Sequence, residues 1–121
     1  MASFVPGRSL VDNVFSLTRP LWGKPYAEWA MCLARDLIAE RVAADGAERR
    51  EWAAAILWAV ALDAGMDRDA DLWRRVLVDI TTSTGVAEEC ARERFDQLRD
   101  LGLARPRNPP LYWTKSEPQD G

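Results

Sequence analysis

The segment that decides the fold is Thr84-Gly85-Val86-Ala87, which lies between two stretches with helical periodicity. Before it, apolar residues recur over 72–80 at the spacing of one face of an amphipathic helix. After it, they recur over 86–101, and Gly102 follows where a helix commonly stops. The side chains expected to face inward are Leu72, Trp73, Val76, Leu77 and Ile80, then Val86, Cys90, Ala91, Phe95, Leu98 and Leu101. The sequence therefore predicts two helices joined by a tight turn that contains Gly85.

Residues 103–114 continue the pattern with two short apolar stretches around a proline-rich bend. Leu103-Ala104-Arg105 precedes the bend at 106–110, and Leu111-Tyr112-Trp113-Thr114 follows it. Proline removes a backbone donor and is typical of bends and sheet edges. We expect a short β-hairpin here, so the predicted order is helix, turn, helix, strand, bend, strand.

This order, together with residues 84–104, resembles the recognition-helix segment of bacterial winged helix-turn-helix regulators. The positions that match that family's pattern are Gly85, Val86, Ala91, Phe95, Leu98, Gly102 and Leu103. The resemblance implies a winged-helix fold in which the second helix enters the major groove of DNA and the hairpin forms the wing. Two positions depart from the pattern: Ala87 stands where a capping serine is usual, and Thr84 where an apolar residue is usual.

The charge of the second helix bears on DNA binding. Between residues 86 and 101 there are five acidic side chains and three arginines, a net of −2. The acids are Glu88, Glu89, Glu93, Asp96 and Asp100, and the arginines are Arg92, Arg94 and Arg99. Because neutralisation of phosphates supplies most non-specific affinity for DNA, this balance weakens the electrostatic contribution that a recognition helix needs.

Length and composition predict one soluble domain. The chain has 121 residues, 48% hydrophobic and 29% charged, which is enough for a substantial core. A net charge of −3 argues against a surface that binds nucleic acid or anionic membrane on all sides. We expect a mainly all-α domain over 1–121, with N-terminal helices at 9–44, a winged-helix-like core at 47–114 and a disordered tail at 115–121.

The N-terminal part predicts two helices after a loose arm. Residues 1–8 form the arm, and Ser9 caps a helix that we expect Pro20 to end. A linker follows, and Pro25 opens a second helix that reaches about residue 44. That second helix carries two apolar stripes, which predicts contacts on two sides, either with neighbours in the same chain or with a second copy.

A third helix is predicted at about 47–64. It is apolar on all sides from Trp52 to Leu62, so we expect it to be the buried central helix. Acidic residues then alternate at 67, 69 and 71, as in a calcium loop. However, the positions where an EF-hand needs Gly and Glu hold Leu72 and Val78. These acids are expected to stabilise the start of the next helix instead.

The cysteines and the apolar runs bear on the compartment. Cys32 and Cys90 lie in helical patterns with apolar neighbours, and we expect buried free thiols. The N-terminus shows no secretory signal, and the longest apolar run has eleven residues, short of the ~20 that span a bilayer. We therefore expect a cytoplasmic protein without membrane contact.

The residue types needed for catalysis are sparse. The chain has no histidine, which excludes Ser-His-Asp and Cys-His arrangements, and two cysteines cannot complete a structural zinc site. The glycines are scattered singly, so no loop cradles a phosphate. We predict that the protein is not an enzyme and uses no cofactor or metal.

Two functions remain open. The first is a small DNA-binding transcriptional regulator that dimerises through its N-terminal helices and places two recognition helices in neighbouring major grooves. The second is a protein-interaction module, such as a phage- or plasmid-encoded inhibitor, whose acidic winged-helix-like surface docks on a basic surface of a host complex. The six tryptophans favour the second function, because tryptophan is enriched at interfaces.

Both functions use the same candidate residues. Those around the turn are Thr82, Ser83, Glu88, Glu89, Arg92, Glu93, Asp96 and Gln97. Arg92 is suited to guanine and Gln97 to adenine, whereas the hydroxyls of Thr82 and Ser83 suit either phosphates or their own backbone. Arg105 and Arg107, close to Trp113, are expected at the DNA backbone or minor groove.

Overall fold

The computed structural model describes residues 2–40 and 46–102. Within them the elements are α1 (Leu10–Trp22), α2 (Lys24–Ala39), α3 (Gly46–Asp63), a 3-10 turn η1 (Met66–Arg68), α4 (Ala70–Thr84) and α5 (Glu88–Asp100). The all-α prediction is confirmed for this part of the chain. It contains no strand that would support a wing, and the predicted hairpin (103–114) and tail (115–121) lie outside the described residues.

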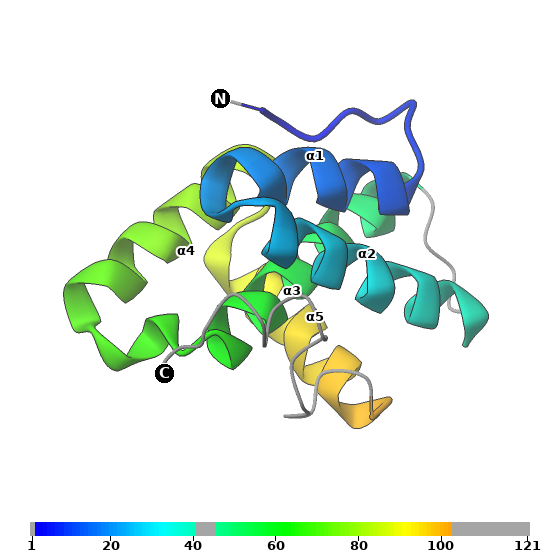
Figure 1. Ribbon diagram of the computed structural model, residues 1–121. Helices are drawn as coiled ribbons and strands as arrows, with labels where there is room; N and C mark the ends of the chain where they lie inside the picture. The colour runs from blue at the N-terminus through cyan, green and yellow to red at the C-terminus, as the bar shows by residue number, and fades with distance from the viewer. Residues whose placement is uncertain (1, 41–45, 103–121) are drawn as a thin grey trace.

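Helix α3 is the centre of the bundle, and the four other α-helices all contact it (Figure 1). Every residue from Trp52 to Ala61 is buried, which confirms the central helix predicted from its apolar run. Its alanines let neighbouring helices approach closely, while Ile56, Leu57 and Val60 fill the space between them. Full burial of each such branched side chain contributes about 1.5–3 kcal/mol.

Two local sequence signals act as predicted at helix starts. Ser9 Oγ accepts a hydrogen bond from Asp12 N at 3.1 Å and caps α1. Asp69 Oδ1 accepts from the backbone N–H groups of Asp71 (2.9 Å) and Leu72 (3.2 Å) and caps α4. Asp69 thus satisfies backbone donors at the N-terminus of α4, the helix start that these acids were predicted to stabilise in place of calcium binding.

Helix α1 does not end at Pro20, and that prediction was wrong. The helix continues two residues past Pro20 to Trp22, although Pro20 has no N–H to donate to the carbonyl four residues before it. Gly23, at φ 103°, ends α1 by donating its N–H to Arg19 O at 2.9 Å, and α2 begins at the next residue. The linker predicted here is therefore a single glycine. Helix α2 then ends at Ala39, earlier than expected.

The N-terminal arm is fixed to the bundle, so its prediction as a loose segment was also wrong. Phe4 is buried in the core, and its N–H donates to Ser83 O at 2.8 Å. The buried Asn13 side chain binds both backbone groups of Val5, since its Oδ1 accepts from Val5 N at 2.8 Å and its Nδ2 donates to Val5 O at 3.0 Å. The first contact joins residues far apart in the sequence and the second joins the arm to α1, and periodicity reveals neither.

Four side chains predicted to face inward are exposed instead. Cys32 and Cys90 are exposed free thiols, because each lies on the outer side of its helix. Leu72 lies in the first turn of α4 and Leu101 just beyond the end of α5, and both are at the surface. For Leu72 and Leu101 the inward pattern was extended too far toward the helix ends, whereas Cys32, in the middle of α2, was assigned to the wrong side of its helix.

Candidate interaction surface

The α4–α5 turn is held by backbone and hydroxyl hydrogen bonds. Gly85 adopts a left-handed conformation (φ 73°), and its N–H donates to Thr81 O at 2.8 Å. Thr84 is buried at the position where an apolar residue was expected, with its Oγ1 donating to Ile80 O at 2.6 Å and accepting from Val86 N at 3.3 Å. A short connection held by these hydrogen bonds therefore joins α4 to α5.

Helix α5 packs one face on α3 and leaves the other to solvent. Ala91, Phe95 and Leu98 are buried, and the Phe95 ring stacks on Trp58 of α3 with centroids 6.3 Å apart. The helical period then places Glu89, Glu93, Asp96 and Asp100, spaced by four, three and four residues, along the outward side. We call these four residues the acidic stripe.

Basic partners for the acidic stripe are few. Asp96 pairs with Arg99 at 3.1 Å, and Glu89, Glu93 and Asp100 have no ion-pair partner among the described residues. Exposed like charges at this spacing repel each other weakly within a helix. The stripe therefore presents a concentrated negative charge that a basic surface would neutralise.

The arginines of α5 serve different purposes. Arg94 turns toward α3, where its Nε donates to Glu51 Oε1 at 2.8 Å and its guanidinium lies 5.1 Å from the Trp52 ring. Arg94 also donates to the Gln97 side-chain oxygen at 3.2 Å, which engages one of the two atoms that a bidentate contact with adenine needs. Arg92 is exposed and makes no hydrogen bond or ion pair with the described residues.

A pocket of about 350 Å³ opens beside the acidic stripe, between α3, α4 and α5. Its lining is Trp58, Leu62, Asp67, Trp73, Leu77, Glu88, Arg92, Phe95, Asp96 and Arg99. Trp58 meets Trp73 edge-on, with ring centroids 5.6 Å apart. We call this the aromatic pocket, because rings line it and charged side chains surround them.

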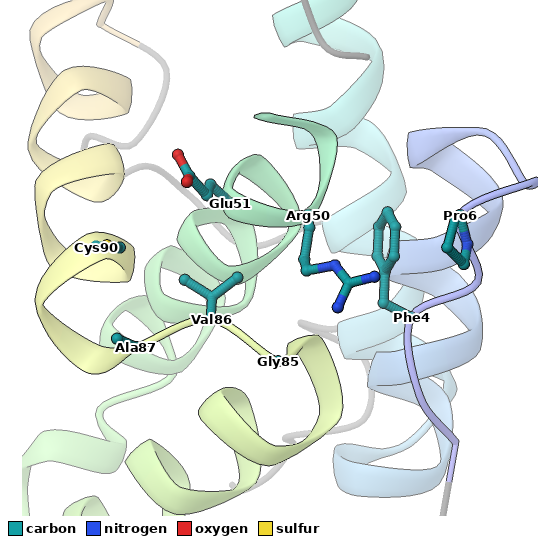
Figure 2. A pocket seen from close by; sticks show the side chains of 8 residues that line it. All are labelled: Phe4, Pro6, Arg50, Glu51, Gly85, Val86, Ala87 and Cys90. Atoms are coloured by element: carbon teal, nitrogen blue, oxygen red, sulfur yellow. The ribbon is translucent and has the colours of Figure 1, made fainter. Parts of the chain in front are cut away.

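A second pocket, of about 490 Å³, lies at the α4–α5 turn beside the N-terminal arm (Figure 2). Its lining is Phe4, Pro6, Arg50, Glu51, Gly85, Val86, Ala87 and Cys90. Arg50 reaches from α3 toward Phe4, with its guanidinium carbon 5.1 Å from the ring centroid. The pocket thus joins the arm to the turn, and its cation is held over an aromatic face.

The structure places the predicted site residues in three groups. Glu88, Arg92 and Asp96 meet at the aromatic pocket, Glu89 and Glu93 lie on the acidic stripe, and Thr82 is exposed on α4. Gln97 is exposed and bound to Arg94, as described above. Arg105 and Arg107 lie outside the described residues.

Ser83 does not belong to an exposed site. It is buried at the end of α4, and its hydroxyl donates to Asp79 O at 2.7 Å. Its prediction as a contact residue is corrected accordingly, because the short side chain bonds to its own helix instead of facing solvent. Trp73 and Asp67 were not predicted for the site, since only packing of three helices brings them to α5.

Comparison with known proteins adds no assignment: no protein-family model, curated protein or solved structure matches the chain. No helix in the described part combines the length and the apolar character needed to cross a membrane. Nor do three or more Cys, Asp or Glu side chains gather among these residues as a metal ion would require.

Proposed function

We propose that the protein is a binding module without catalytic activity, which docks on a basic surface of another protein through α5. The observation that carries this proposal is the acidic stripe, in which Glu89, Glu93 and Asp100 lack a basic partner within the described residues. A partner rich in lysine or arginine would gain charge-assisted contacts along one helix face. Such complementarity favours fast and selective association.

The aromatic pocket supports the same proposal by offering an anchor point next to the stripe. Trp58, Trp73 and Phe95 line it, and Glu88 and Asp67 lie at the same opening. An arginine or lysine side chain from the partner could place its aliphatic part against the rings and its charge beside the carboxylates. Interfaces concentrate their energy in anchors of this kind, surrounded by polar contacts.

Duplex DNA is the second candidate, and the exposed Arg92 favours it. Arg92 lies in the first half of α5, the helix that the winged-helix resemblance assigns to the major groove, and it is free of partners in the described part. It could read a guanine there. The acidic stripe opposes this function, because Glu89 and Glu93 share the outward side of the same helix.

One titration with two fluorescent probes tests both functions. The probes are a short peptide of alternating arginine and glycine and a random-sequence DNA duplex, each followed by anisotropy at low and near-physiological salt. We expect the peptide to bind, with affinity that weakens as salt rises. The double variant Glu89→Gln/Glu93→Gln should lose roughly twofold to thirtyfold in affinity, as two exposed charge pairs of about 0.2–1 kcal/mol each imply.

The matched control is Glu40→Gln/Glu48→Gln, which makes the same change in net charge at two exposed positions away from α5, just after the end of α2 and in the first turn of α3. It should leave peptide affinity within twofold of the original, roughly the limit for distant surface charges. Equal losses of peptide affinity in both double variants would mean that only the net charge of the protein matters, which would contradict a binding site on α5. Binding to the DNA probe that disappears in Arg92→Ala would favour the second candidate instead.

A further inference from the structure

Helix α2 has an outer face that no described element covers. Its inner side is buried through Ala27, Ala30, Leu33, Ala34 and Leu37. On the opposite side lie Glu28, Cys32, Arg35 and Ala39, again spaced by four, three and four residues. Figure 1 shows α2 at the edge of the bundle, with its C-terminal half extending outward.

Apolar side chains border this outer face. Ile38 is 49% exposed, one of few large apolar side chains on the described surface, and Met31 is half-buried about two helical turns before it. Beside them, the exposed Cys32 adds a small apolar side chain. An apolar border along a charged face is typical of a surface that packs against another helix.

The charges on this face are complementary to themselves when two copies run antiparallel. If a two-fold axis passes between residues 31 and 32, Glu28 of one copy lies opposite Arg35 of the other, and the same pair forms a second time. Met31 and Cys32 then meet their own counterparts at the axis, and Ile38 lies against the aliphatic stem of Lys24. A parallel pair would instead set Glu28 against Glu28 and Arg35 against Arg35.

Glu28 and Arg35 are both available for a contact with a second copy. Arg35 is exposed and makes no ion pair within the described residues. Within the described residues, Glu28 is paired only with Lys24, four residues earlier, at 3.8 Å, a geometry worth little at the surface. Each of the two charges can therefore gain a partner from a second copy without breaking a strong contact.

We infer that the outer face of α2 is a homodimer interface, in which a second copy of this chain packs antiparallel across Met31 and Cys32. The helix has 16 residues and is therefore about 24 Å long, so the pair buries less surface than a standard interface. The dimer is accordingly a weak one that forms at elevated concentration. It would carry two α5 surfaces, which raises avidity for a partner with repeated sites.

The inference is independent of the partner of α5 and can be tested with the cysteines already present. Two packed helices lie 8–10 Å apart, which brings facing Cα atoms on the two-fold axis to roughly 4–5 Å, within the range of a disulfide. Diamide, which takes up the two electrons and two protons, should therefore link Cys32 to Cys32 of the second copy. Non-reducing electrophoresis then detects the covalent dimer.

The variant Cys90→Ser keeps only Cys32, and Cys32→Ser keeps only Cys90, which is equally a free exposed thiol and serves as the matched control for random collision. We expect the chain with Cys32 alone to cross-link on the order of tenfold faster or more, because docking raises the effective concentration of the paired thiols. Equal rates in the two variants would overturn the inference.

A charge exchange provides a second measurement that does not depend on thiols. Arg35→Glu sets acid against acid twice across the axis, and the dimer should disappear in sedimentation velocity experiments. Glu28→Arg/Arg35→Glu restores both opposite-charge pairs in reversed order and should restore the dimer. Circular dichroism verifies that each variant keeps its helices. A double variant that stays monomeric while folded, at concentrations where the original chain dimerises, would overturn the antiparallel pairing.

Discussion

Helices α3 and α5 pack against each other, yet they use their residues in opposite ways. All of α3 from Trp52 to Ala61 is buried, so nearly every side chain in that run contributes to the core. In α5 only Ala91, Phe95 and Leu98 are buried, and the outward side carries the acidic stripe. A helix enclosed on all sides supplies mainly stability, and this run of α3 contributes to the aromatic pocket only through Trp58, whereas a helix at the edge can supply both stability and a contact surface.

The largest effect is expected from a cavity in α3. Leu57 is fully buried, and Leu57→Ala should lower the free energy of unfolding by roughly 2–5 kcal/mol, because it removes packed methyl groups and leaves a void. Urea denaturation followed by circular dichroism measures this change. The matched control is Val78→Ala on α4, where the side chain is 57% exposed, and it should stay within about 0.5 kcal/mol of the original. Similar losses in the two variants would contradict the contrast between an enclosed and a peripheral helix.

A smaller effect is expected at Gly85, which sets the direction in which α5 leaves α4. Gly85→Ala should cost about 1–2 kcal/mol, since an L-residue is strained at this positive φ. The added Cβ would also lie 2.8 Å from Arg50 Nη1, so the Arg50 side chain must shift. Gly102→Ala is the control, because Gly102 has a similar φ (82°) with no described atom within 4 Å of the new Cβ. Thermal unfolding should show the larger loss at Gly85, and equal losses would mean that Arg50 moves freely.

The start of α5 offers a gain in stability. Ala87 occupies the N-cap with φ −63° and ψ 149°, close to the φ −67° and ψ 163° of Ser9, which caps α1. Ala87→Ser should therefore accept a hydrogen bond from the first turn without rearrangement and stabilise the protein by about 1 kcal/mol. Removal of the cap in Ser9→Ala should cost a similar amount. No gain from Ala87→Ser in urea denaturation would show that solvent already satisfies the first turn of α5.

The smallest effect on stability is expected on the acidic stripe itself. Glu93 is exposed and unpaired within the described residues, so Glu93→Gln should change the free energy of unfolding by less than about 0.5 kcal/mol. The same substitution should weaken binding of the arginine-glycine peptide. A loss of stability beyond 1 kcal/mol, which is roughly the effect of a buried hydrogen bond, would show that Glu93 has a structural role.

Much of the helical framework was predictable because its signals are local. The apolar run of α3, the capping Ser9 and Asp69, and the stop at Gly85 act within a few residues of one another. The helical period of α5 also placed the candidate residues Glu89 and Glu93 on its outward side, once its inner side was known. Boundaries were less accurate, as the passage of α1 through Pro20 shows, because neighbouring packing can outweigh a single helix-breaking residue.

The parts that could not be predicted depend on contacts between distant residues. Nothing near Phe4 indicates that it enters the core, and nothing near Asn13 indicates that it binds Val5. Likewise, Trp58, Trp73 and Phe95 come from three helices and form the aromatic pocket only when these pack together. The helical period of α4 predicted that Trp73 faces inward. It could not show that the Trp73 ring meets Trp58 edge-on beside a row of carboxylates.

The sequence by itself determined that this chain forms helices around one apolar central helix and that α5 carries an excess of acids, because periodicity, caps and charge are written in neighbouring residues. Only the tertiary structure decided which of those acids face solvent unpaired, which arginine is engaged by α3, and which cysteines are exposed. The physical reason is that a side chain's exposure and partners depend on the direction in which whole helices pack, and that direction is set by contacts among residues far apart in the chain.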